Sequence, residues 1–168
     1  MRPNTIEIRK IWEWTKDDTN SLFKPFILNN EPGGFGLGPS SGYAIYLFCM
    51  MDIWGSIFRN SFNKWGTGKN IVDFLERLKQ KYPDLYEFGD KQLLIVADEL
   101  RNNVVHNYGL RVIESNNNRE WLNIDVNSPM QVINIQDDDR WHIDCMRLKD
   151  HLLEIIREWL LLNNYVVK

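Results

Sequence analysis

Apolar residues recur every three or four positions along most of the chain, and this spacing predicts a mainly α-helical protein. The run at 43–51 is apolar on every face, so we expect it to begin a central, buried helix. A polar run at 17–20 interrupts the first helix, and Pro25 would stop or kink the apolar stretch that follows. The glycine-rich residues 29–42 are typical of a connecting loop. We expect helices over residues 5–14, 43–62, 71–82 and 91–107, and a last helix that starts at the acidic run 137–139.

The period of the pattern changes after Gly109, from a helical repeat to an alternation of apolar and polar residues. Leu122, Ile124 and Val126 alternate with polar neighbours, which is typical of a half-buried strand. Residues 110–114 and 130–135 have a similar character and are its expected partners. We therefore predict one domain over residues 1–168, an up-and-down bundle of four or five helices. A small antiparallel β-meander at 110–135 is inserted before the last helix.

Composition and charge narrow the possible functions. Hydrophobic residues make up 43% of the chain and charged residues 26%, which is ordinary for a globular domain. The net charge of −3 provides no general attraction to nucleic acid, so we expect no coating of DNA, although a local RNA site is compatible with it. The longest apolar run, 43–51, is far shorter than the roughly 20 residues that span a membrane. No apolar signal core follows Met1. The chain is therefore expected to be cytoplasmic, with no membrane partner.

The two cysteines, Cys49 and Cys145, both stand among apolar residues, so we expect two buried thiols in a reducing compartment. Their spacing fits no zinc motif, and we expect neither a metal nor a cofactor. In the last helix, apolar residues follow a 3-4-3-4-3 spacing that predicts a core or dimer stripe. The members of this stripe are Cys145, Leu148, Leu152, Ile155, Trp159 and Leu162. His142 and His151 lie near it and are expected to be structural or surface residues.

The stretch 100–109 brings histidine, arginine and paired amides together inside an apolar, helix-like run. At 100° per residue, Asn102 and His106 share a face roughly opposite the apolar stripe of the same helix. Arg101 lies about 140° from His106 on the same wheel. One straight helix cannot easily direct both side chains at one atom. Either the helix breaks before His106, or a second copy of the chain brings its own histidine alongside.

The pattern Arg101-Asn102-x-x-x-His106 resembles the signature of the HEPN (higher eukaryotes and prokaryotes nucleotide-binding) superfamily. Tyr108, two residues after the histidine, also fits a longer form found in HEPN toxins that are paired with minimal nucleotidyltransferases. The resemblance implies a HEPN-like helical bundle and a metal-independent endoribonuclease, of which a toxin or defence component is one expected form. Its site would be formed by two copies of the motif across a homodimer interface.

The side chains of the motif suit this chemistry. His106 titrates near neutral pH and can take the proton from a ribose 2′-OH, which then attacks the adjacent phosphate. The products would be a 2′,3′-cyclic phosphate and a 5′-OH. Arg101 can stabilise the charge that develops on the phosphate. Asn102 can orient the imidazole or contact the phosphate. Asp52, which interrupts an apolar helix, needs a partner and could support Arg101, although pairing with an unrelated residue is the simpler expectation.

Two other functions remain open from the sequence. The chain could be a non-catalytic HEPN-like module that binds a nucleotide or a protein, with Arg101 and His106 as an interface pair. It could also be a toxin that a partner nucleotidyltransferase, acting as antitoxin, silences by modifying Tyr108. A packing aromatic near the end of the helix is the simplest structural role for that tyrosine.

The most basic stretch of the chain runs from residue 59 to residue 81, where six basic residues stand against two acidic ones. Arg59, Lys64 and Lys69 are the candidates for contacts with an RNA backbone, because aromatic residues are interleaved with them. The alternative is a solvated helix face, which is the commoner origin of such a run.

Overall fold

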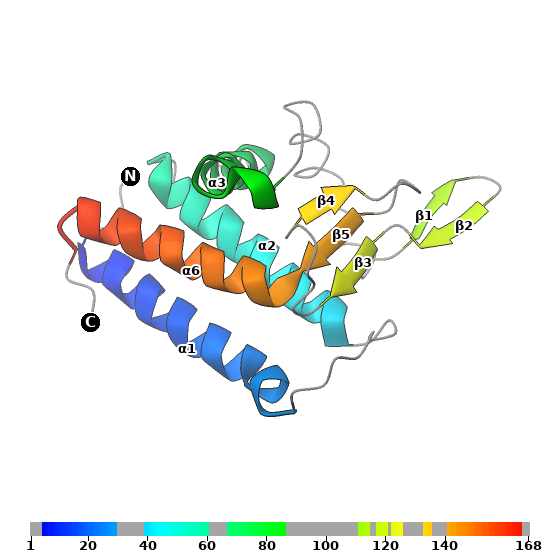
Figure 1. The fold of residues 1–168 in the computed structure, drawn as a ribbon. Coiled ribbons are helices and arrows are strands. Elements are labelled where there is room, and N and C mark those ends of the chain that lie inside the picture. The colour runs from blue at the N-terminus through cyan, green and yellow to red at the C-terminus, as the bar shows by residue number, and fades with distance from the viewer. Residues whose placement is uncertain are drawn as a thin grey trace.

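The computed structural model describes residues 5–29, 39–60, 67–86, 111–114, 117–120, 122–125, 133–135 and 141–165. This part of the chain is mainly α, as the periodicity predicts, with four α-helices (Figure 1). A short 3-10 helix, η1 (Pro83–Leu85), follows the third of them. The α-helices are α1 (Thr5–Asn29), α2 (Pro39–Phe58), α3 (Thr67–Lys81) and α6 (Cys145–Leu162). The expected motif helix at 91–107 lies outside the described residues.

Helix α1 is continuous over 25 residues, so the predicted interruption at 17–20 is wrong. The polar residues at 17–20 do not stop the helix, because some of them face solvent and the buried one has a hydrogen-bond partner. Asp17 and Asp18 are exposed, whereas Thr19 is buried and donates its hydroxyl to the carbonyl of Thr15, one turn earlier. The helix also continues past Pro25 and ends at Asn29.

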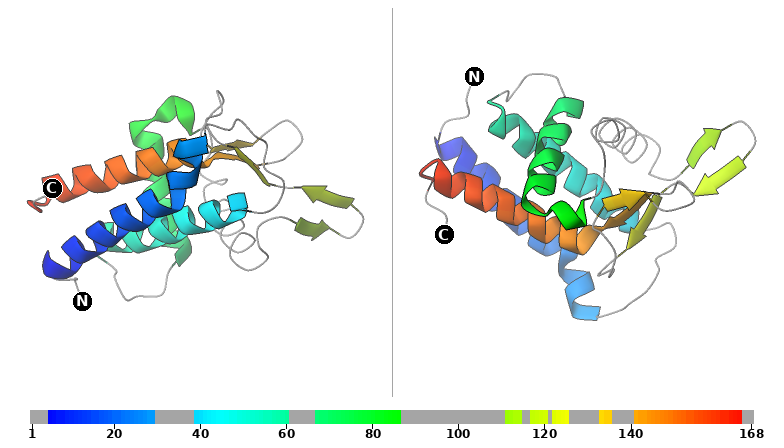
Figure 2. Two further views of the ribbon diagram at one scale, coloured as in Figure 1. Left: turned by 90° about the horizontal axis from the view of Figure 1, so that it is seen from below. Right: turned by 45° about the horizontal axis from the view of Figure 1, so that its top comes forward.

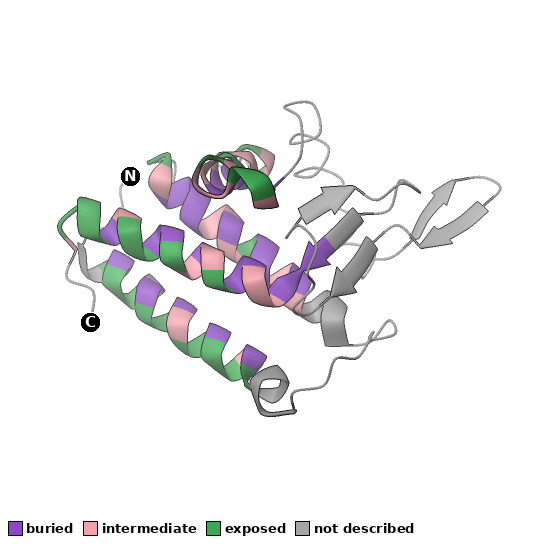
Figure 3. Cartoon of the chain, in the orientation of Figure 1, coloured by how far each residue is buried: buried purple, intermediate pink, exposed green. Residues whose placement is uncertain are grey.

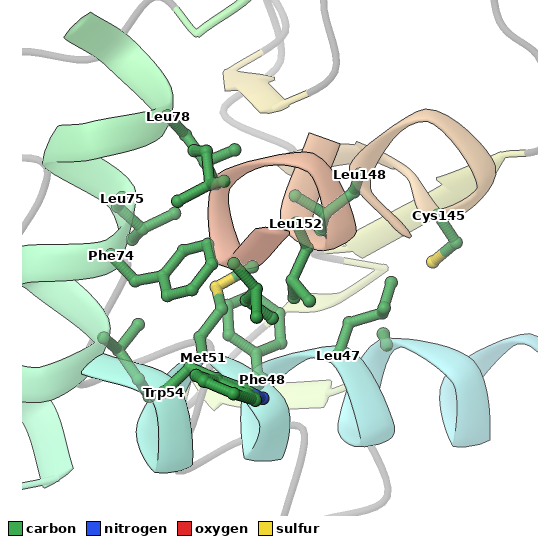
Figure 4. Packing of buried hydrophobic residues seen from close by; sticks show 14 of the residues in the cluster. Leu47, Phe48, Met51, Trp54, Phe74, Leu75, Leu78, Cys145, Leu148 and Leu152 are labelled. Carbon is green, nitrogen blue, oxygen red and sulfur yellow. The ribbon is translucent and has the colours of Figure 1, made fainter. Parts of the chain in front are cut away.

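Helix α2 lies at the centre of the helical core and packs against α1, α3 and α6 (Figures 1 and 2). Its buried hydrophobic residues are Ala44, Leu47, Phe48, Met51, Trp54 and Ile57. Figure 4 shows several of them meeting side chains of α3 and α6. The central helix is thus confirmed, but α2 begins at Pro39, so the end of the expected loop at 29–42 is helical. Its opposite edge carries Cys49, which is exposed and not buried as predicted. Figure 3 shows how buried and exposed positions alternate around each helix.

Residues 111–114, 122–125 and 133–135 are strands, as predicted, whereas residues 141–144 form a strand where the start of the last helix was expected. The strands do not form the expected meander. β1 (Arg111–Glu114) pairs antiparallel with β2 (Asn117–Glu120) as a separate hairpin. A second sheet has the order β3-β5-β4, in which β5 pairs parallel with β3 and antiparallel with β4. The strands of this sheet are β3 (Leu122–Asp125), β4 (Ile133–Ile135) and β5 (Trp141–Asp144). Alternation marks extended residues but does not specify their partners, so the central position of β5 was not predictable.

The last helix begins later than the sequence predicts. Its N-cap is Asp144, whose Oδ1 accepts hydrogen bonds from the backbone nitrogens of Met146 and Arg147, both at 3.1 Å. A carboxylate does stand at the positive end of the helix dipole, but it is not one of those at 137–139, which lie outside the described residues. The predicted apolar stripe is largely core. Its first four members are buried, Trp159 is half-buried, and Leu162 is exposed.

None of the described helices is both long enough and apolar enough to cross a membrane.

Candidate functional site

The sequence-predicted site residues divide into two groups. Arg101, Asn102, His106 and Tyr108 lie outside the described residues, and so does Lys64. The structure does describe Asp52 and Arg59, which lie on or just after α2, and Lys69, which lies in the first turn of α3. Asp52 and Arg59 both contact Asn70, the residue that follows Lys69, where the last turns of α2 meet the beginning of α3.

Helices α2 and α3 touch backbone to backbone at this corner. A Cβ atom added to Gly55 would lie 2.0 Å from the carbonyl oxygen of Asn70, far inside van der Waals contact. Only glycine at position 55 therefore permits this crossing. Asn70 is 4% exposed and lies within α3, because this helix begins at Thr67 and not at residue 71 as predicted.

The side chain of Asn70 joins Asp52 to Arg59. Its Nδ2 donates to Asp52 Oδ1 at 2.8 Å, and its Oδ1 accepts from Arg59 Nη1 at 3.1 Å. A carboxylate can only accept and a guanidinium can only donate, so the two partners fix the orientation of the amide. Asp52 thus has a hydrogen-bond partner outside the motif. Any contact of Asp52 with Arg101 falls outside the described residues.

The basic residues of this region differ in how far their charges are compensated. Lys81 lies 2.7 Å from Glu154 and 2.5 Å from Glu158, two carboxylates of α6. Arg77 is held by Asp73 at 3.0 Å and lies 4.8 Å from the ring centre of Phe58. Arg59 and Lys69 are both exposed at the α2–α3 corner. Two of the three predicted RNA contacts thus have exposed side chains at this corner.

A second cluster of titratable side chains forms between the end of α3 and α6. His151 of α6 stacks on Tyr82, with ring centres 3.9 Å apart and planes at 16°. Its Nδ1 lies 2.8 Å from the hydroxyl of Tyr86, which is buried. Tyr82 in turn donates to Glu154 Oε2 at 2.7 Å. This cluster was not predictable from the sequence, because more than 60 residues separate its two halves and neither half has a motif of its own.

The environment of the second cluster shifts several pKa values. Burial lowers the pKa of His151, and the positive charge of Arg147 lowers it further, against the nearby carboxylates. Burial also raises the pKa of Tyr86 far above its ordinary value. The pKa of Tyr82 rises to about 12, first through burial and then through its hydrogen bond to Glu154. Hydrogen bonds from Lys81 and Tyr82 lower the pKa of Glu154. At neutral pH the cluster therefore holds a neutral imidazole between two protonated phenols.

Within the ranges described above, no three histidine, cysteine, aspartate or glutamate side chains gather closely enough to hold a metal ion. The chain matches no protein-family model, no curated protein and no solved structure.

Proposed function

We propose that this chain is a metal-independent endoribonuclease of HEPN type, working in the cytoplasm as a homodimer. The observation that carries the proposal is the pattern Arg101-Asn102-x-x-x-His106, followed by Tyr108. The mainly α fold is compatible with a HEPN-like up-and-down bundle, to which the segment around the motif would add a further helix. A role as a toxin or defence component would follow from such an activity.

In the proposed reaction, His106 removes the proton from a ribose 2′-OH as general base. The 2′-oxygen forms a bond to the adjacent phosphorus, and the bond from phosphorus to the 5′-oxygen breaks. The leaving oxygen takes up a proton and becomes a 5′-OH, and the other product carries a 2′,3′-cyclic phosphate. Arg101 stabilises the negative charge on the phosphate in the transition state, and Asn102 orients the imidazole. The step needs no metal ion.

Contacts at the α2–α3 corner support the binding half of the proposal. Arg59 and Lys69 are exposed there, and the hydrogen bond from Arg59 Nη1 to Asn70 holds the guanidinium near α3. Two such charges suit the phosphates of a short single strand. Lys64 belongs to the chain between α2 and α3 and would add a third charge. The hydrogen bond to Asp52 orients the side-chain amide of Asn70, and this amide in turn holds Arg59.

The decisive experiment is cleavage of a panel of labelled single-stranded RNAs in EDTA, scored for cyclic-phosphate ends. Wild type should cleave, His106→Ala should be inactive, and Arg101→Ala should be slower by about 10²–10³-fold, the usual cost of losing one charge-stabilising donor. A His142→Gln variant is the matched control, since it removes a histidine that lies outside the proposed site. Equal cleavage by wild type and His106→Ala would show that the motif is not catalytic.

Two alternatives make other predictions in the same assay. A non-catalytic module would bind nucleotide or protein and leave every RNA intact. Its specific support is the net charge of −3 and the neutralisation of Lys81 by two glutamates, which both weaken attraction to RNA. A toxin controlled through Tyr108 would cleave RNA until a partner nucleotidyltransferase modified that tyrosine, and Tyr108→Phe would resist this inhibition.

A further inference from the structure

Trp14 is a large apolar side chain on the outer side of α1, well inside the helix and away from its ends. Its exposed fraction is 63%. Among the described residues, the other large hydrophobic side chains that are mainly exposed are Leu161 and Leu162, in the last turn of α6. Figure 3 shows the exposed positions that run along this side of α1. Tryptophan is enriched where proteins contact one another, so this side chain indicates an interaction surface.

Partly exposed apolar side chains of α1 and α2 extend the surface around Trp14. Ile11 lies three residues before it on α1 and is half-buried. On α2, Tyr46 and Met50 are half-buried, and both contact Thr15, the residue that follows Trp14. The Tyr46 hydroxyl donates to the Thr15 carbonyl at 3.2 Å, and Thr15 Oγ1 lies 3.7 Å from the sulfur of Met50. We call Ile11, Trp14, Tyr46 and Met50 the α1–α2 patch.

Opposite charges stand on α1 before and after Trp14. Lys10 and Asp18 are both exposed and lie four residues to either side of it, so the three side chains share one face of the helix. Each charge is about 6 Å along the helix axis from the tryptophan. Burial raises the pKa of Tyr46, and the negative charge of Asp18 raises it further. Asp18 therefore lies on the flank of α1 that borders α2, next to the α1–α2 patch.

This order of charges is complementary to itself. When two α1 helices lie antiparallel with their Trp14 side chains together, Lys10 of each copy stands beside Asp18 of the other. A parallel arrangement would instead bring like charges together. Glu7, one turn beyond Lys10, would face the uncharged Ser21, so the antiparallel pair brings no like charges together at these positions. The arrangement has the twofold symmetry of the commonest homodimers.

We propose that the α1–α2 patch binds a second copy of this chain, with the two α1 helices antiparallel about Trp14. The tryptophan is the anchor that the second copy buries, and the pairs between Lys10 and Asp18 fix the orientation. The contact uses no residue of the motif at 101–108, and it does not depend on RNA cleavage.

The test is sedimentation equilibrium of the full-length protein over a range of concentrations, at neutral pH and low salt. Wild type should associate. Trp14→Ala should raise the dissociation constant of this contact by at least about 30-fold, the usual effect of losing an interface anchor. Its fold should be unchanged because the side chain is mainly exposed, and circular dichroism checks this. A wild type that stays monomeric, or a Trp14→Ala variant that associates as tightly as wild type, would overturn the proposal.

Charge reversal tests the orientation of the second copy. Lys10→Glu and Asp18→Lys should each weaken self-association by at least about tenfold, because each places like charges together at both ends of the contact. An equimolar mixture of the two variants should associate like wild type, since each variant then meets opposite charges on the other. Arg9→Glu is the matched control, because it makes the same change in net charge about 140° around the helix from Trp14. A mixture that stays dissociated, or a control as weak as Lys10→Glu, would contradict the antiparallel contact.

The same measurements separate this contact from its alternatives. A patch that serves a different protein or a lipid surface would leave wild type monomeric, which overturns the proposal. If the dimer of the proposed function also forms through another face, wild type should reach a tetramer and Trp14→Ala should stop at a dimer. Association that none of the variants changes would belong to that other face alone. RNA cleavage enters none of these measurements, so they can fail or succeed independently of the proposed function.

Discussion

The side-chain amide of Asn70 on α3 donates a hydrogen bond of 2.8 Å to the carboxylate of Asp52 on α2. The same amide accepts from Arg59, so one buried asparagine lies between a negative and a positive side chain. The contact lies at the close crossing of the two helices, where Gly55 meets the backbone of Asn70. It therefore links the helix crossing to the position of an exposed arginine that we propose as an RNA contact.

Asn70→Asp should destabilise the protein because it replaces the donor to Asp52 with a second carboxylate. We expect a loss of about 1–3 kcal/mol in the free energy of unfolding, the usual cost of disrupting a buried polar contact. Urea denaturation at neutral pH gives the measurement. The exchanged pair, Asp52→Asn with Asn70→Asp, should recover most of the loss, since it restores one donor and one acceptor and places the new carboxylate beside Arg59. If the double variant is as unstable as Asn70→Asp, the contact between residues 52 and 70 is not the cause of the lost stability.

Gly55→Ala should be costly although it adds a single methyl group. The new Cβ would lie 2.0 Å from a backbone oxygen of α3, which cannot rotate away, so the two helices must separate. Overpacking of this kind costs about 1–3 kcal/mol in the free energy of unfolding, or more where backbone must move. Thermal and urea unfolding both measure it. Ser21→Ala, at an exposed position of α1, is the control and should change stability by no more than about 0.5 kcal/mol.

The helical core was largely predictable because its elements follow from local periodicity. The apolar run at 43–51 is enough to identify the central helix, and the spacing from Cys145 to Ile155 identifies the buried face of α6. The error at Cys49 shows a limit of this reasoning. Nine consecutive apolar residues must point in every direction around a helix, and one edge of α2 faces solvent.

What could not be predicted depends on partners that are distant in sequence. Thr19 belongs to the run that was predicted to break the helix, and Thr15 follows the predicted helix end at residue 14. Helix α2 supplies Trp54 and Tyr46 as hydrogen-bond partners for these two hydroxyls. The pairing of β5 between β3 and β4 has the same origin, since alternation carries no information about neighbours. His151 likewise looked unpartnered until the fold brought Tyr82 and Tyr86 to it.

Thr15→Val should weaken the attachment of α1 to α2. Thr15 is buried, and its Oγ1 accepts from Trp54 Nε1 at 3.0 Å, so valine keeps the shape but leaves the indole N–H without that acceptor. We expect a loss of about 1–3 kcal/mol in the free energy of unfolding, measured by urea denaturation. Thr15→Ser retains the hydroxyl and should lose less. The explanation fails if serine and valine are equally destabilising.

Lys81→Met should have only a small effect, and that effect should depend on pH and salt. Glu154 and Glu158 are each 53% exposed at the side chain, so we expect less than about 1 kcal/mol from these ion pairs. The pKa of Glu154 is lowered in the folded state, so its stabilisation is present above its unfolded value of about 4.5 and is lost as pH falls through the folded value. The difference in the free energy of unfolding between wild type and Lys81→Met should therefore shrink as the pH falls through the folded-state pKa of Glu154. It should also shrink at high salt. Lys24→Met, at an exposed site on α1, should show neither dependence.

We expect the α2–α3 corner to bind RNA through Arg59 and Lys69. This binding is best measured by fluorescence anisotropy in a His106→Ala background, where the proposed cleavage cannot consume the RNA. Arg59→Gln removes the charge while leaving an amide that can still donate to Asn70, and Lys69→Gln changes an exposed side chain. Each variant should weaken binding to single strands and reduce the slope of log affinity against log salt by about 0.7, the value for one lost phosphate contact.

The matched controls are Arg9→Gln and Lys10→Gln, which remove the same charges from exposed positions of α1. Because all four variants change the net charge equally, a general electrostatic effect would lower all four slopes together. Only a decrease confined to Arg59 and Lys69 would identify this corner as the place where RNA binds.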